Sequence, residues 1–333
     1  MNSIRKAMAA VLALGTGACA TVVEPEEGEV TAQGANTLAI VEGVEPATAR
    51  QITATRDRYD PVYQDPPRID PNFPPAIAEL AIDSAGERLN GIAYLADGPG
   101  PHPTIFLLHG WPGNEKSLDI AQALRRAGFN AVFFHYRGTW GSGGAFTFQN
   151  VIEDVAAAKA HLIAEAGPLR VDPDRITLIG HSMGGWAALQ AAARDETIGC
   201  VGALASADFG ASAEAMAANP EALAGFAAYG DYLAAGPFSG TSGAAMVAEV
   251  QENVDAFSVA PLAPKLAGKS VLLIAANTDE AVDADTVHEP MAAAFATEPE
   301  ITLTATRIDG DHSFSWTRET LIREILAWAE GCR

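Results

Sequence analysis

The chain has 333 residues, of which 48% are hydrophobic and 19% are charged, and its formal net charge is −21. This length and composition permit a large buried core, so the sequence indicates one large domain with additions. A surface this acidic repels phosphate backbones and anionic lipid headgroups, which excludes nucleic acid as an expected partner.

The first twenty residues have the pattern of an export signal. Arg5 and Lys6 precede a short apolar stretch from Ala7 to Leu14, and small residues follow up to Ala20. The apolar stretch is much shorter than the ~20 residues that a membrane-spanning helix needs. Residues 1–20 are therefore predicted to be a signal peptide.

Two ways of cleaving this signal remain open. Ala18-Cys19-Ala20 suits an ordinary signal peptidase, whereas Thr16-Gly17-Ala18-Cys19 resembles the signal of a bacterial lipoprotein. In the second case Cys19 is lipidated, and that lipid is the only membrane attachment that we expect. Both alternatives predict an exported protein, either periplasmic or anchored to the outer membrane of a bacterium.

The next segment, residues 21–75, is acidic and rich in proline, with little apolar periodicity. That composition is typical of a linker and an irregular lead-in. Ile77 to Ile82 and Leu89 to Leu95 then flank a short turn that contains glycine. This pattern predicts an antiparallel hairpin.

From residue 104 onward, short apolar runs alternate with helical patterns. Such alternation, added to the hairpin, predicts an α/β fold with a doubly wound, mostly parallel, eight-stranded sheet. The expected strands are 104–108, 131–134, 176–179, 201–205, 271–275 and 301–307, and the expected helices are 118–127, 151–164, 183–194 and 317–330.

Between residues 206 and 270 the alternation stops, and alanine-rich sequence with scattered aromatic residues replaces it. We interpret this segment as a helical cap inserted into the core, which then comprises residues 76–205 and 271–333. The alternative is that its helices only cover the edge of the sheet and contact no ligand.

The segment Gly180-His181-Ser182-Met183-Gly184 follows a predicted strand and precedes an alanine-rich helix. In that context Gly-x-Ser-x-Gly is a nucleophile elbow, a bend so tight that the residues two positions from the serine need to be almost free of side chain. Gly180 and Gly184 meet this requirement. Ser182 is therefore the predicted nucleophile.

A second glycine-containing turn, His109 to Gly113, directly follows the predicted strand 104–108. A loop at this position brings a backbone N–H toward the serine, and the helix after the elbow directs its first amides to the same place. The amides of Trp111 and Met183 are the predicted oxyanion hole. Losing one such donor typically costs about 3 kcal/mol of transition-state stabilisation.

A serine hydroxyl needs a histidine to accept its proton and an acid to orient that histidine. The chain order serine, acid, histidine leaves His288 and His312 as candidates. His288 falls in a predicted helix, whereas His312 lies in a loop between the last strand and the last helix. His312 is thus the predicted base, and activity is expected to fall at acid pH because the base has to be neutral.

The acid is expected just after the strand 271–275, where Asp279 is the first carboxylate. Asp279 is therefore the predicted acid. Asp208, which follows another strand, is the alternative in a variant arrangement. The remaining nearby carboxylates are predicted to be solvated charges at the start of a helix: Glu280, Asp283 and Asp285.

The sequence lacks the residue spacing of phosphate-binding, dinucleotide-binding and metal-binding motifs. Lys116-Ser117 and Gly268-Lys269-Ser270 lack the glycines of a phosphate-binding loop, and Phe146 occupies the position of the third glycine of a dinucleotide fingerprint. No cluster of His, Cys and Asp has metal-ligand spacing. The sequence predicts neither a metal nor a cofactor.

Taken together, these segments resemble the α/β-hydrolase superfamily, and more closely its bacterial esterase and prolyl-oligopeptidase-like branch. The resemblance extends from about Ile77 to Cys332. It implies the α/β-hydrolase fold with a small cap and acyl transfer to water through a serine acyl-enzyme, without a cofactor. The residues that carry it are His109 to Gly113, Tyr136-Arg137-Gly138, Gly141-Ser142, Gly180 to Gly185, Asp279 and His312.

The expected activity is hydrolysis of a small carboxylic ester. The peptidase relatives carry a large N-terminal propeller for which this chain has no room, which favours the esterase. Two alternatives stay open: a small serine peptidase or amidase that acts on short peptides, and a non-catalytic binding protein with the same fold.

Beyond the signal, Cys200 and Cys332 are the remaining cysteines. In this fold the closing helix runs away from the catalytic edge, so both are expected at the opposite edge of the sheet. An even pair in an oxidising compartment is compatible with a disulfide, and two unpaired thiols are the alternative.

Overall fold

A computed structural model describes residues 59–332 of the chain. The predicted signal peptide, Cys19 and most of the acidic lead-in lie outside the described residues. The strands are β1 (Ala76–Ser84), β2 (Glu87–Leu95), β3 (His102–Leu108), β4 (Asn130–Phe134), β5 (Val171–His181), β6 (Cys200–Leu204), β7 (Ser270–Ala276) and β8 (Thr302–Ile308).

These strands form one eight-stranded sheet in the order β1-β2-β4-β3-β5-β6-β7-β8. The strand β2 pairs antiparallel with β1 and with β4, and the later strands from β4 to β8 pair in parallel. The predicted fold class is confirmed. Ala85 and Gly86 join β1 to β2 in a two-residue turn in which both have positive φ, 52° and 82°, as a tight hairpin requires.

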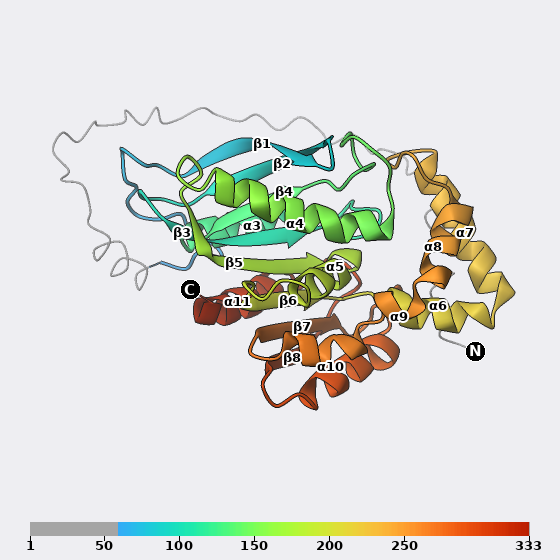
Figure 1. Cartoon of the computed structure of the whole chain (residues 1–333). Helices are drawn as coiled ribbons and strands as arrows, with labels where there is room; N and C mark the ends of the chain where they lie inside the picture. The colour runs from blue at the N-terminus through green and yellow to red at the C-terminus, as the bar shows by residue number, and fades with distance from the viewer. Residues whose placement is uncertain (1–58, 333) are drawn as a thin grey trace, which may run out of the picture.

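Helices cover both faces of the sheet (Figure 1). The helices that flank the sheet are α3 (Leu118–Arg126), α4 (Phe148–Ala164), α5 (Met183–Ala192), α10 (Glu289–Ala296) and α11 (Arg318–Ala329). In Figure 1, α4 and α5 lie on the face toward the viewer, and α3 and α11 lie behind the sheet.

Strand periodicity explains this layering. On β3, Phe106 and Leu108 contribute to the core under α4 and α5, whereas Ile105 and Leu107 contribute to the core under α3 and α11. Successive side chains of a strand point to opposite faces, so a strand covered on both sides is apolar throughout. The apolar runs of the sequence follow from that double burial.

Two element boundaries differ from the predicted ones by three residues or more. The strand β5 begins at Val171 rather than at residue 176, because its first residues include exposed polar side chains that hide the pattern. The helix α4 begins at Phe148 rather than at residue 151, and the side chain of Thr147 caps it by accepting a hydrogen bond from Asn150 N, 2.9 Å. Such a cap satisfies one of the free amides of a helix start.

Residues 206–269, which we call the cap, contain helices and none of the strands of the sheet; the last residue of the predicted insertion, Ser270, already belongs to β7. The helices are α6 (Phe209–Ala217), α7 (Pro220–Ala234), α8 (Gly243–Glu252), α9 (Val254–Phe257) and the 3₁₀ helix η1 (Ala260–Leu266). In Figure 1, α6 to α8 lie beyond the end of the sheet where the parallel strands finish. Ligands of open α/β sheets bind at this end of the strands.

A disulfide joins Cys200, at the start of β6, to Cys332, near the end of the chain, with their Cα atoms 6.1 Å apart. Of the two alternatives for these cysteines, the structure has the bridged one. The bridge closes a loop of 132 residues, for which the chain-entropy model gives a stabilisation of about 4 to 5 kcal/mol.

The described part of the lead-in, residues 59–75, contains neither helix nor strand. It nevertheless packs on the core, because Arg126 of α3 donates hydrogen bonds to the carbonyls of Pro61 (2.6 Å) and Val62 (2.9 Å). On α11, Arg323 pairs with Asp60 at 2.5 Å. Across residues 59–332, no helix is both long and apolar enough to cross a bilayer.

Candidate active site

Ser182 lies at the bend between β5 and α5, in the segment Gly180–Gly185 that we call the elbow. Its backbone is left-handed, with φ 57° and ψ −120°, a conformation that costs a non-glycine residue about 1 to 3 kcal/mol. The Ser182 N–H donates to the carbonyl of Leu204 on β6, 2.9 Å. The neighbouring strand thus holds the strained bend in place.

Glycine is required on both sides of this serine. A Cβ on Gly180 would lie 1.9 Å from the carbonyl oxygen of Gly184, and a Cβ on Gly184 would lie 2.0 Å from that of Leu108. Both obstacles are backbone atoms, which cannot turn aside as the end of a side chain can. The pattern that identified the elbow in the sequence therefore has a steric cause.

The loop His109 to Gly113, which we call the oxyanion loop, lies directly against the elbow. A Cβ on Gly110 would meet the Cβ of Ser182 at 3.0 Å. The peptide bond between Trp111 and Pro112 is cis, and Gly113 has φ 89°. Gly110, which directly precedes Trp111, thus lies beside Ser182, where an oxyanion would need a donor if Ser182 is the nucleophile.

The side chain of His109 forms a hydrogen bond inside the oxyanion loop. This side chain is buried, and its Nδ1–H donates to the carbonyl of Gly110, 2.8 Å. Burial lowers the pKa of His109 to about 3, so the imidazole stays neutral across the physiological range.

Met183 starts α5 and is buried. The first amides of a helix have no partner inside the helix, and they carry the positive end of its dipole. The Met183 amide thus belongs to a helix end that favours negative charge beside Ser182.

His312 and Asp279 come together after the last two strands. The Nδ1–H of His312 donates to Asp279 Oδ2, 2.7 Å, and the other oxygen of Asp279 accepts from the backbone N–H groups of Ala281 (2.8 Å) and Val282 (2.7 Å). The Asp279 side chain is fully buried, whereas that of His312 is 26% exposed. With its proton on Nδ1, the imidazole has its lone pair on Nε2.

His181 connects this pair to the elbow. The Nε2–H of His181 donates to the carbonyl of His312, 2.6 Å, and the two imidazole centroids are 4.7 Å apart. His312 therefore lies beside the residue that precedes Ser182. The hydrogen bonds of the described chain do not include one between Ser182 Oγ and His312 Nε2. Catalytic contacts of this kind are often long before substrate binds.

The alternative residues have other partners. Asp208 caps α6, where it accepts from Ala211 N (3.0 Å) and Val259 N (3.1 Å). Asp283 accepts from Thr286 N, 3.0 Å, and Asp285 pairs with Arg307 at 2.6 Å. His288 is buried in the short π-helix η2 (Ala284–His288), and that burial lowers its pKa.

The cap contacts the oxyanion loop through three aromatic side chains, Trp111, Phe226 and Tyr229, which we call the aromatic cluster. The Trp111 ring lies 5.0 Å from that of Phe226 and 4.9 Å from that of Tyr229, between centroids. Among the described residues, Trp111 Nε1 is the one buried side-chain polar atom without a hydrogen-bond partner. A buried donor of this kind is costly unless it meets an acceptor.

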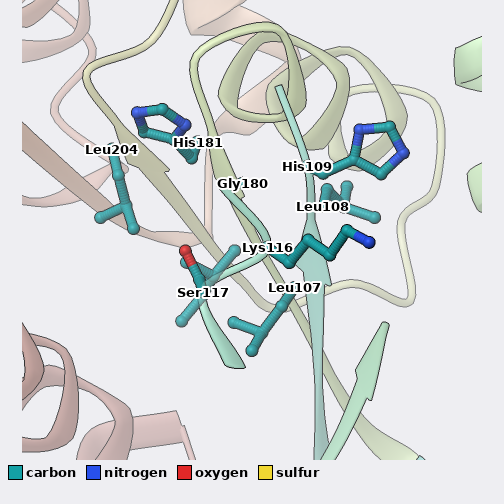
Figure 2. A pocket seen from close by; sticks show the side chains of 9 residues that line it. Leu107, Leu108, His109, Lys116, Ser117, Gly180, His181 and Leu204 are labelled. Carbon is teal, nitrogen blue, oxygen red and sulfur yellow. The ribbon is translucent and has the colours of Figure 1, made fainter. Parts of the chain in front are cut away.

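Two cavities adjoin these residues, and they differ in size. An open depression of about 420 Å³ lies beside His312, between the loops after β7 and β8, and is lined by Thr278, Glu280, Ala281, Asp311, His312, Ser313 and Trp316. The second cavity is shown in Figure 2. Its lining includes Gly180 of the elbow, and His109 and His181 lie on opposite sides of it. Its volume is about 10 Å³, which excludes a substrate, since one water molecule needs that much.

Sequence reasoning missed two residues of this region. His181 is only a variable position of the elbow pattern, although it binds the His312 loop. Trp140 belongs to no recognised pattern, although its indole N–H donates to the carbonyl of Pro112, 2.7 Å. Neither bond has a sequence signal, because each joins segments far apart in the chain.

Within residues 59–332, no group of three or more His, Cys, Asp or Glu side chains is placed to hold a metal ion. The buried Arg137 instead pairs with Asp154 at 2.6 Å and donates its backbone N–H to the same carboxylate, 2.7 Å. Asp154 also accepts from Ser84 Oγ, 2.6 Å. This buried group ties the end of β4 to α4 and β1.

Comparison with solved structures gives similar folds at low sequence identity. A puromycin-hydrolysing peptidase from Mycobacterium tuberculosis shares 19% identity with a TM-score of 0.58, over 76% of this chain and 40% of that one. Est1E from Butyrivibrio proteoclasticus, also solved with ferulic acid bound, shares 18% with a TM-score of 0.54, over 76% and 98%. An esterase from Pyrococcus furiosus shares 20% with a TM-score of 0.54, over 78% and 92%.

Comparison with curated proteins finds no match. The sequence profile of the alpha/beta hydrolase family matches residues 105–324, which include the oxyanion loop, the elbow, Asp279 and His312. The chain therefore belongs to the alpha/beta hydrolase family.

Proposed function

We propose that this protein is a serine hydrolase that cleaves small carboxylic esters through Ser182, His312 and Asp279. The observation that carries the proposal is the backbone of Ser182, which is left-handed and strained at a bend where only glycines fit on either side. Strain of this kind persists where surrounding structure enforces it, and it concentrates at functional sites.

In the proposed reaction, Ser182 Oγ attacks the ester carbonyl carbon while His312 Nε2 accepts the hydroxyl proton. Asp279 supports the imidazolium that forms, because it already holds Nδ1–H at 2.7 Å. The amides of Trp111 and Met183 stabilise the oxyanion. His312 then protonates the departing alcohol, and a water molecule deprotonated by the same histidine hydrolyses the acyl-enzyme.

Two features support the access that this reaction needs. His312 is partly exposed, and it lines the depression of about 420 Å³ into which a leaving alcohol can depart. The aromatic cluster is half-buried, and it packs the cap against the oxyanion loop through Trp111; we propose that its apolar side chains contact the acyl group. An ester with an apolar acyl group is therefore the substrate class that we propose.

Labelling with a fluorophosphonate, which phosphonylates activated serines, tests the nucleophile. We expect the wild-type protein to be labelled and Ser182→Ala to be unlabelled, with ester hydrolysis reduced by about 10⁴-fold or more. Ser206→Ala is the matched control, because Ser206 is also buried next to the elbow, and it should label normally. Labelling that persists in Ser182→Ala would contradict the proposal.

A substrate series separates the remaining alternatives. Aryl esters of increasing acyl length should be hydrolysed, and aminoacyl anilides should react far more slowly. Faster cleavage of the anilides would favour the small peptidase or amidase. A protein that binds these compounds and is never labelled would be the non-catalytic relative.

We also propose that the protein is exported, as its first twenty residues predict. The Cys200–Cys332 disulfide supports this, because structural disulfides persist in oxidising compartments. The intact mass of protein from its native host should lack the signal peptide, and a lipid on Cys19 would add a diacylglyceryl group. Two free thiols in the mature protein would contradict the proposal.

A further inference from the structure

The loop after β4 contains a tryptophan in an unusual backbone conformation. Trp140 has φ 48°, in the left-handed region that residues other than Gly, Asn and Asp rarely adopt. Its side chain is only partly buried, so core packing alone does not explain why this conformation is kept. The polar contacts of the residue do explain it.

Trp140 contacts the oxyanion loop through its side chain. The indole N–H donates to the carbonyl of Pro112, 2.7 Å, and Pro112 directly follows Trp111, the proposed oxyanion donor. The Nζ of Lys116 lies 5.0 Å from the centroid of the Trp140 ring, and His135 stacks on the same ring with centroids 6.0 Å apart. Both neighbours restrict the rotation of the indole.

Trp140 contacts the cap through its backbone. Its N–H donates to the carbonyl of Pro237, 2.8 Å, in the segment between α7 and α8. Thr139 forms a β-bridge with Phe238, and Ser239 N donates to the carbonyl of Gly138, 2.8 Å. The segment that carries Trp140 is therefore fixed to the cap by several backbone contacts.

We propose that Trp140 is a positioning residue for the oxyanion hole. It holds the carbonyl of Pro112, and with it the Trp111 amide, in a fixed relation to the cap. This inference rests on the proposed function. The bond is made to the backbone of the oxyanion loop, and Trp140 is not a member of the aromatic cluster, so we expect it to act on the transition state more than on substrate binding. A donor displaced by a fraction of an ångström then reduces kcat and leaves KM almost unchanged.

Trp140→Phe tests this, because it removes the N–H and keeps an aromatic ring. We expect kcat for an aryl ester to fall by about tenfold or more, with KM within a factor of three. The affinity for a trifluoromethyl ketone, which binds as a tetrahedral oxyanion, should fall in parallel with kcat/KM. Trp328→Phe is the matched control, because it removes an indole hydrogen bond to Ser270 (3.0 Å) at the opposite end of the sheet, and it should change neither value.

A second variant distinguishes loss of the indole hydrogen bond from misfolding of the protein. Replacing Trp140 by 3-benzothienylalanine exchanges only the indole N–H for sulfur, and it should reproduce the loss in kcat at an unchanged melting temperature. A kcat within twofold of the wild type in this variant would overturn the proposal, as would a loss that appears in KM alone. A wild-type protein that hydrolyses no ester would instead contradict the proposed function.

Discussion

The elbow and the cap both contact the candidate site, but the residues through which they do so tolerate change to different degrees. At the elbow, backbone carbonyls lie where a Cβ on Gly180 or Gly184 would have to be. In the cap, Phe226 and Tyr229 pack their rings against Trp111 of the oxyanion loop, and another apolar side chain can replace such a ring in part. The proposed chemistry therefore depends on backbone constraints, whereas the proposed selectivity depends on side chains that can be exchanged.

The largest effect is expected when one glycine in each region is replaced by alanine. Gly184→Ala places a Cβ 2.0 Å from the Leu108 carbonyl oxygen, so β3 and α5 have to separate. We expect a loss of about 3 kcal/mol or more in the free energy of unfolding, measured by urea denaturation, and loss of esterase activity.

Gly236→Ala, in the cap, is the matched control. The nearest atoms to its Cβ would be carbonyl oxygens 3.8 Å away, which is ordinary contact. Its unfolding free energy should stay within about 0.5 kcal/mol of the wild type. Equal losses in the two variants would mean that the close backbone contact at Gly184 does not cause the loss.

The same contrast explains what the sequence could predict. Two glycines spaced around a serine between a strand and a helix leave few backbone solutions, so Ser182 and its surroundings follow from residue types alone. The chain order then leaves His288 and His312 as the candidate bases. The loop position of His312 and the place of Asp279 directly after a strand favour these two residues. Apolar runs predict the sheet because its strands are covered on both faces.

The packing of the cap helices and the Trp140 bond could not be predicted in this way. The helices α7 and α8 cross where a Cβ on Gly243 would lie 1.7 Å from the Ala227 carbonyl oxygen, and alanine-rich sequence does not reveal which glycine makes such a contact. The hydrogen bond from Trp140 joins residues 28 positions apart. Periodicity carries no information on contacts of that kind.

Buried titratable groups near the elbow and in the cap change the free energy of unfolding in opposite directions as the pH falls. Burial lowers the pKa of His109 and of His181 to about 3, whereas an unfolded histidine binds a proton near pH ~6.5. Between those values the unfolded chain holds more protons, so the elbow side loses stability as the pH falls through that window. In the cap, burial raises the pKa of Asp208 and of Glu249. These groups therefore favour the folded state as the pH falls through the range just above their ordinary pKa of ~4.

We expect the unfolding free energy in urea to decrease from about pH 7 to about pH 4. His181→Gln keeps an N–H donor for the His312 carbonyl but does not titrate, so it should make the decrease smaller. Asp208→Asn removes the opposing group and should make it steeper. Identical slopes in the wild type and in His181→Gln would show that the buried imidazole does not control acid stability.

The smallest expected effect concerns the aromatic cluster. Phe226→Ala removes a ring 5.0 Å from that of Trp111, and such a contact is worth about 0.5 to 1.5 kcal/mol. We expect KM for an ester with a bulky apolar acyl group to rise about two- to tenfold, with kcat and the KM for an acetyl ester almost unchanged. Tyr232→Ala is the control, since Tyr232 stacks on Tyr229 but is 70% exposed. If Phe226→Ala changed kcat instead of KM, the cap would take part in the chemistry, and the distinction between a constrained elbow and an exchangeable cap would fail.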